Sequence, residues 1–151
     1  MRKLVIAAIA ISVPGLVAAN ALTDAVKQRQ NFMKGYGESV GMLARMAKGE
    51  VEYDAATAQG AADRIAEMAH RDTSAWYVPG SSSADLPGVS YALPALWADG
   101  AKVGEIAGRM APAAETLKVA AGEGRAQMAG ALGGVGQVCQ DCHKSFQAKK
   151  D

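Results

Sequence analysis

The sequence predicts an all-α protein, and more specifically an antiparallel four-helix bundle. Four segments place apolar residues at helical spacing, short or modest connections separate them, and no convincing strand intervenes. Half of the 151 residues are hydrophobic but only 5% are aromatic, a composition that suits closely packed helices better than sheets. The length is that of a single domain.

The first 19 residues have the pattern of a secretory signal peptide. Arg2-Lys3 gives a positive start, residues 4–13 form an apolar run, and Val17-Ala18-Ala19 fits the small-x-small cleavage rule. The apolar run is short for a membrane span, which needs about 20 residues, and an uncleaved membrane anchor is the alternative. We expect cleavage before Asn20 or two residues later, export to the periplasm, and a soluble mature domain over residues 20–151.

The first two helices are expected over residues 23–48 and 55–71. Gly49 can end the first helix, and Asp54 is a good N-cap for the second. The inner stripe of the first helix is expected to consist of Val26, Met33, Tyr36, Val40, Leu43 and Ala47. That of the second helix should consist of Ala58, Ala61, Ile65 and Met68.

A long irregular connection and a third helix follow. Residues 72–91 contain two Pro-Gly dipeptides and three consecutive serines, which are typical of a loop. The third helix is expected over residues 94–121, with a kink or local break caused by Pro112, because proline lacks the backbone N–H and crowds the preceding turn.

The fourth helix is expected over residues 125–149. Met128, Leu132, Val135, Val138, Cys142 and Phe146 follow the helical period. Gly133, Gly134 and Gly136 interrupt this pattern with residues that lower helix propensity. These glycines indicate either room for a neighbouring group or a frayed or kinked turn.

The strongest functional signal is Cys139-Gln140-Asp141-Cys142-His143, which contains the only two cysteines of the chain. It is a C-x-x-C-H motif, the pattern of a c-type haem attachment site. The two thiols add across the two vinyl groups of haem, and the adjacent imidazole reaches the iron. We therefore expect one covalent haem c on Cys139 and Cys142, with His143 as the proximal iron ligand.

Two other chemistries use cysteines at this spacing. A thiol–disulfide active site places its first cysteine at a helix N-terminus after a strand, whereas this motif lies deep in a predicted helix. A zinc site needs four ligands, and the remaining candidate, His70, lies on another predicted helix. His70 is expected to meet the negative end of its helix dipole, or alternatively to act as a second iron ligand.

Met33 has a candidate role at the same site. The first and fourth helices should be neighbours in the bundle, so the Met33 thioether can face the iron opposite His143. Met/His ligation suits electron transfer and raises the reduction potential. The net charge of +1, without a block of like charge, excludes a nucleic-acid partner, which would need a clustered basic face.

In motif position and helix pattern together, the mature chain resembles the class II cytochromes c, which are the cytochrome c′ group and its low-spin, Met-ligated relatives. In this family the haem motif lies near the C-terminus of a four-helix bundle. Weaker marks occur in the same order along the chain: Arg29-Gln30 followed by Met33, Lys48-Gly49-Glu50, Tyr53-Asp54-Ala55-Ala56, Ser83-Ala84-Asp85-Leu86-Pro87-Gly88, Leu96-Trp97 and Gly133-Gly134-Val135-Gly136.

The resemblance implies further site residues. Arg29 and Gln30 would lie close to the haem, near its propionates, and Met33 would occupy the distal position. High-spin members have a bulky residue there that crowds a five-coordinate iron, which admits NO or CO. In low-spin members a methionine ligates the iron. The family usually has a basic residue four positions after the haem histidine, where this chain has Gln147.

The absence of that basic residue, and the suitability of thioether ligation for electron transfer, favour the Met-ligated form. The sequence thus predicts a periplasmic monohaem cytochrome, not an enzyme, that transfers single electrons between redox partner proteins. The alternative is a high-spin cytochrome c′ that binds NO or CO. The resemblance also suggests a homodimer through the first two helices, although small apolar residues there serve the core equally well.

Overall fold

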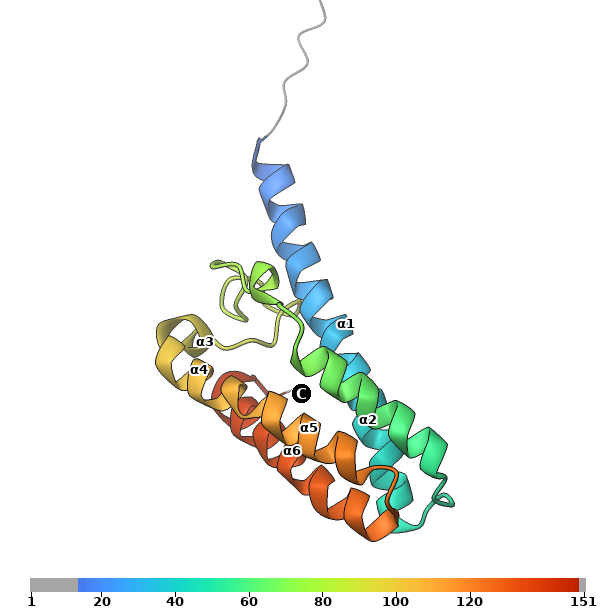
Figure 1. Cartoon of the computed structure of the whole chain (residues 1–151). Helices are drawn as coiled ribbons and strands as arrows, with labels where there is room; N and C mark the ends of the chain where they lie inside the picture. Colours follow the sequence, from blue (N-terminus) through green and yellow to red (C-terminus); the bar gives the residue numbers. More distant parts are fainter. Residues whose placement is uncertain (1–13, 150–151) are drawn as a thin grey trace, which may run out of the picture.

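The computed structural model describes residues 14–149, which form a four-helix bundle (Figure 1). Its helices are α1 (Pro14–Lys48), α2 (Ala55–Ala69), α5 (Met110–Ala120) and α6 (Arg125–Phe146). Both α1 and α5 pack against α2 and α6, so α1 and α5 lie across a diagonal. Successive bundle helices run in opposite directions (Figure 1). The predicted fold class is confirmed.

The long connection between α2 and α5 contains short elements. These are a 3₁₀ turn, η1 (Ser74–Trp76), and two helices, α3 (Ala95–Ala98) and α4 (Gly100–Gly108). Residues 14–149 form no β-strand, and one isolated antiparallel bridge joins Ala92 to Gln147. No helix in this part of the chain is long and apolar enough to cross a membrane.

The ends of α1 differ in how well the sequence predicts them. The helix ends at Lys48 as expected, because Gly49 takes a left-handed conformation with a φ of 74°. It begins at Pro14 rather than at residue 23, since proline is favoured in the first turn of a helix and Gly15 does not interrupt it. Most of the predicted signal peptide, residues 1–13, lies outside the described residues, so its cleavage stays a prediction.

The predicted cap of α2 is confirmed. The Asp54 carboxylate accepts a hydrogen bond from the Thr57 backbone N–H at 2.7 Å. The helix ends at Ala69, slightly before the predicted position, and His70 is its C-cap.

The predicted third helix is divided into α3, α4 and α5. The first interruption is at Asp99, whose carboxylate accepts the Lys102 backbone N–H at 3.1 Å and so caps α4. The second is at Arg109, which separates α4 from α5 just upstream of Pro112. The break expected from Pro112 is therefore present, one turn earlier, where its ring would crowd the carbonyl of Gly108.

α6 is continuous through its three glycines, so they do not form a frayed turn. A Cβ on Gly134 would lie 3.9 Å from that of Ala113 on α5, which is ordinary contact, and Gly133 and Gly136 border open space. The helix ends at Phe146 rather than at residue 149, because Gln147 turns extended and pairs with Ala92.

The core follows the predicted faces with one exception. Its fully buried large side chains include Leu43, Ile65, Leu117, Met128 and Val135, one or more from each bundle helix. A smaller apolar cluster is formed by Ile106, Val138 and Phe146. Met33 is the exception, since its side chain is 42% exposed although it lies on the predicted inner stripe. At its level α1 borders a cavity rather than the packed core.

Candidate haem site

A cavity of about 640 Å³ opens between the N-terminal half of α1 and the C-terminal end of α6. It brings together five of the six residues predicted for the site, and the sixth, Cys139, lies one turn earlier on α6. The five are Arg29, Gln30, Met33, Cys142 and His143. Because they come from two helices far apart in the sequence, only the folded bundle assembles this set.

The lining fits a covalently attached haem. Val26, Leu96 and Phe146 give the cavity an apolar wall, while Cys142 and His143 bring a thiol and an imidazole to the same space. A thiol for attachment and an imidazole for the iron are the donors that a c-type haem needs. His143 is exposed in the protein alone, so its ring is accessible from the cavity.

The two thiols do not have the electrostatics of a redox-active dithiol. Burial raises the pKa of Cys139. The pKa of Cys142 is also raised, first by burial and then by the nearby Cys139 thiol. A thiol–disulfide active site needs a depressed pKa, so this site argues against that alternative. Residues 14–149 also contain no cluster of three or more His, Cys, Asp or Glu that could hold a zinc ion.

A contact that the sequence analysis missed holds the motif from outside the cavity. The Asp141 carboxylate accepts hydrogen bonds from Arg109 at 2.7 Å and from Gln137 at 2.8 Å. These bonds, the one from Arg109 first, hold the pKa of Asp141 below its ordinary value. The i,i+4 spacing of Gln137 and Asp141 could have suggested one bond, but nothing in the sequence indicated Arg109.

Two tyrosines near the thiols were also missed as site residues. Burial, and then the neighbouring Cys139 and Tyr77, raise the pKa of Tyr36 to about 12. Burial, followed by Cys142, also raises the pKa of Tyr77, which lines the cavity. Both phenols therefore stay protonated at neutral pH. Tyr36 was predicted only as a core residue, and Tyr77 lies in an irregular segment without a periodic signal.

Arg29 and Gln30 both contact the segment that follows η1. Arg29 is buried and donates hydrogen bonds to Trp76, Ser81 and Ser90, and Gln30 Nε2 donates to the Val89 carbonyl at 2.8 Å. Residues 76–93 are called the strap below. Burial lowers the pKa of Arg29, and the nearby Tyr77 opposes that effect.

His70 does not line the cavity. Its Nε2 lies 3.0 Å from Glu115 Oε1, which links the end of α2 to α5 on the exposed surface. This position agrees with the expected place at a helix C-terminus, and it is incompatible with the alternative role of second iron ligand.

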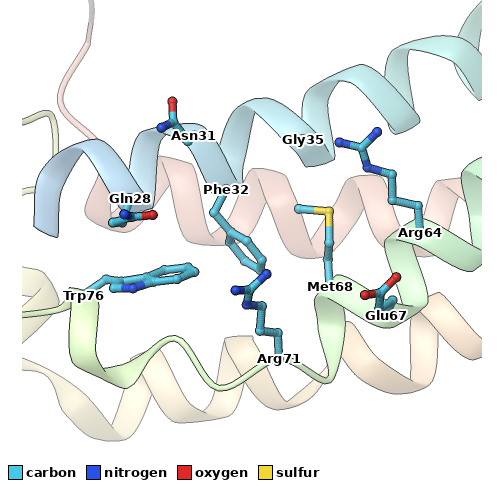
Figure 2. A pocket seen from close by; sticks show the side chains of 9 residues that line it. All are labelled: Gln28, Asn31, Phe32, Gly35, Arg64, Glu67, Met68, Arg71 and Trp76. Carbon is cyan, nitrogen blue, oxygen red and sulfur yellow. The ribbon is translucent and has the colours of Figure 1, made fainter. Parts of the chain in front are cut away.

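A second, smaller hollow of about 310 Å³ lies on the face formed by α1, α2 and η1 (Figure 2). Phe32, Met68 and Trp76 supply its apolar surface. The guanidinium carbon of Arg71 lies 5.4 Å from the centre of the Trp76 ring. Gly35 allows α2 to approach, since a Cβ there would lie 3.2 Å from the Met68 methyl carbon. No cysteine or histidine lines this hollow, so it is not the haem site.

A family profile described as Cytochrome C′ matches residues 24–147, which include the motif and all of the bundle except residues 14–23 at the start of α1. The chain belongs to the cytochrome c′ family. Members of this family bind one covalent haem c through a C-terminal C-x-x-C-H motif, so the predicted family and cofactor are both confirmed. Cytochromes c′ are in general haem proteins without enzymatic activity.

Individual relatives include cytochromes c′ and a cytochrome c-554. A cytochrome c′ of Cereibacter sphaeroides is 36% identical over 99% of this chain and 100% of its own. Cytochrome c-554 of the same organism is 30% identical over 89% of this chain and 92% of its own.

Solved structures of cytochromes c′ have the same fold. One from Rhodobacter sphaeroides has a TM-score of 0.82 and 34% identity, covering 85% of this chain and 98% of its own. A ferrous variant from Alcaligenes xylosoxidans with bound NO has a TM-score of 0.73 and 25% identity. The match covers 85% of this chain and 97% of that variant.

Proposed function

We propose that this protein is a periplasmic cytochrome c′ that binds NO or CO at its haem iron. Cys139 and Cys142 would hold the haem covalently, and His143 would bind the iron from one side. The observation that carries the proposal is the similarity to cytochromes c′, which extends over almost the entire chain. Met33 lines the same cavity as His143, so its thioether would lie beside the haem, where it either crowds an open side of the iron or binds it.

The relatives support the same reading. The cytochrome c′ of Cereibacter sphaeroides aligns along almost the entire chain. A ferrous variant of the Alcaligenes xylosoxidans cytochrome c′ has bound NO. When bound, haem supplies an iron that changes between ferric and ferrous and accepts a diatomic ligand.

The chain itself would attach, orient and shield this group. The two thioether bonds and the His143 ring would fix it to α6, while Val26, Leu96 and Phe146 keep the cavity wall apolar. A flexible, bulky thioether at Met33 would crowd the side opposite His143 without closing it to a small gas molecule.

A second candidate is a one-electron carrier in which Met33 ligates the iron. Two observations favour it: Met33 lines the same cavity as His143, and the cytochrome c-554 of Cereibacter sphaeroides is 30% identical. Met/His ligation suits electron transfer with redox partner proteins. The two candidates differ in the coordination number of the iron.

Absorption spectra of the purified protein, made in cells competent for cytochrome maturation, distinguish these functions. We expect a broad, high-spin ferrous spectrum that changes on addition of CO or NO. Sharp α and β bands that CO does not alter would instead establish the Met-ligated carrier. Mass spectrometry should show a chain that begins at Asn20 or Leu22 and carries the mass of one haem, with no titratable thiol. A colourless protein with two free thiols would contradict both candidates.

Export to the periplasm and a homodimer through α1 and α2 belong to the same proposal. Cell fractionation tests the location, and sedimentation of the holoprotein with and without CO tests the oligomeric state.

A further inference from the structure

Arg29 is a buried cation whose hydrogen bonds within residues 14–149 all go to uncharged oxygen atoms. It is 6% exposed, and none of the ion pairs in residues 14–149 includes it. Burying a guanidinium is costly unless its donors are satisfied. Here Nη1 donates to the Trp76 carbonyl at 3.0 Å and to Ser81 Oγ at 2.7 Å. Nη2 donates to the Ser81 carbonyl at 2.8 Å and to Ser90 Oγ at 3.4 Å.

Two aromatic rings also contact this guanidinium. Its central carbon lies 5.5 Å from the centre of the Tyr77 ring and 5.4 Å from that of Trp97, within the range of cation–π attraction. Trp97 Nε1 donates to the Tyr77 carbonyl at 3.0 Å, which ties the two aromatic residues together. All the acceptors and one of the rings belong to the strap, so the donors of Arg29 are directed mainly at this segment.

The other end of the strap is fixed to α6. The Leu93 N–H donates to the Phe146 carbonyl, and the Ala148 N–H donates to the Tyr91 carbonyl, both at 2.8 Å. These bonds lie just after His143 in the chain. The strap therefore joins α1, which carries Met33, to the end of the helix that carries the haem motif, and Tyr77, Ser90 and its neighbours line the cavity.

We propose that Arg29 is a positioning residue that acts on the haem cavity by holding the strap across it, rather than through its charge. The planar guanidinium donates in several fixed directions at once, which the single ammonium group of lysine cannot reproduce. The strap also has internal hydrogen bonds, such as those from the Ser83 N–H to the Ala92 carbonyl and from the Leu86 N–H to the Ser82 carbonyl, and Gln30 binds it at Val89. It contains no α-helix or β-strand, and such segments open locally when an anchor is lost. The inference rests on the proposed function for the presence of haem in this cavity.

The test compares Arg29→Lys with Arg29→Gln in the haem-containing protein. Both variants should lose the strap anchor, so chymotrypsin should cut within residues 76–93 under conditions in which the native protein is resistant. CO should bind the ferrous form at least about tenfold faster. The reason is that the strap opens more often once it has lost at least one hydrogen bond to a charged group. Arg64→Gln, at an exposed arginine of α2 outside the cavity, is the matched control and should match the native protein in both assays.

A direct effect of the charge on the haem would give a different pattern. In that case Arg29→Lys would restore native proteolysis and CO kinetics, and only Arg29→Gln would shift the reduction potential; this result overturns the proposal. The double variant Ser81→Ala/Ser90→Ala keeps Arg29 but removes two of its acceptors, and it covers the case in which the Arg29 variants do not fold. It should release the strap partially, and native resistance to chymotrypsin would overturn the proposal as well.

The proteolysis result does not depend on an open iron position. If the spectra establish Met33 ligation, the proposed gas-binding function fails, but cleavage of the strap in the Arg29 variants still supports the positioning role. If CO binds normally while the strap of both Arg29 variants stays intact, the proposed function stands and the role of Arg29 is overturned.

Discussion

At the residue scale, one turn of α6 makes contacts on two sides of the helix. Cys142 and His143 line the cavity, whereas Asp141 of the same motif pairs with Arg109 and Gln137. An ion pair this exposed contributes little to stability. It links the motif on α6 to Arg109, the residue between α4 and α5.

Met33 provides the residue-scale prediction. If the iron has an open position, Met33→Ala should leave the ferrous spectrum high-spin, and CO should associate faster because a crowding side chain is removed. If Met33 is a ligand, the same change should convert a low-spin spectrum to high-spin. Stopped-flow CO binding and absorption spectra measure both effects.

Met42→Ala is the matched control for this variant. Met42 is a partly buried methionine of α1 that does not line the cavity. It should leave the spectrum and the CO kinetics unchanged. Equal changes in both variants would mean that the effect comes from general loosening of α1 rather than from the place of Met33.

At the element scale, helix ends and breaks follow from a few local bonds. Asp54 begins α2, Asp99 begins α4, and each accepts the backbone N–H three residues later. Gly49 ends α1 with a positive φ. These two caps and the glycine turn thus set where α2 and α4 begin and where α1 ends.

Asp54→Ala should lower the melting temperature at neutral pH, because α2 loses its N-cap. Hydrogen bonds from Thr57, its side chain first and its backbone N–H second, hold the pKa of Asp54 below the ordinary 3.8. The stabilising effect is therefore complete above pH 3.8 and is lost as the pH falls through the lower pKa of the folded state. Melting curves of both proteins should converge in that acidic range, and a difference that persists there would contradict this account.

Pro112→Ala tests how much strain Pro112 adds at the α4–α5 break. Pro112 lies in the first turn of α5, where its missing N–H would have no partner in any case. We expect a change in unfolding free energy within about 0.5 kcal/mol, compared with about 3 kcal/mol for a proline in a helix interior. Urea denaturation measures it, and stabilisation by several kcal/mol would show that the proline strains a helix that would otherwise be continuous.

At the scale of the whole molecule, the sequence predicts the architecture and the motif better than it predicts the strap. Helical periodicity identified the buried faces because packing requires it, and C-x-x-C-H identified the site because its chemistry is local. The buried role of Arg29 depends on Ser81 and Ser90, which lie more than 50 residues away in an irregular segment. Such contacts have no period and no motif. Met33, in contrast, was predicted to face the haem, and it lines the same cavity as His143.

The residues that form the main core differ from those that line the haem cavity, which gives a final prediction. Leu117 on α5 is fully buried in the main core, away from the cavity, whereas Phe146 belongs to the smaller cluster and lines the cavity. Leu117→Ala should lower the unfolding free energy by about 2–5 kcal/mol. It should leave the ferrous spectrum and the CO kinetics unchanged.

Phe146→Ala should lower the unfolding free energy by a similar amount, about 3–5 kcal/mol. It should also alter the absorption spectrum, because it removes part of the cavity wall and loosens the hydrogen bond from the Leu93 N–H to the Phe146 carbonyl. Val119→Ala, on the same helix as Leu117 but 70% exposed, should change stability by no more than about 0.5 kcal/mol. Urea denaturation and absorption spectra of the three holoproteins distinguish these effects. An altered spectrum in Leu117→Ala would mean that the core and the haem site are mechanically coupled through α5 and α6, because those two helices pack directly on each other.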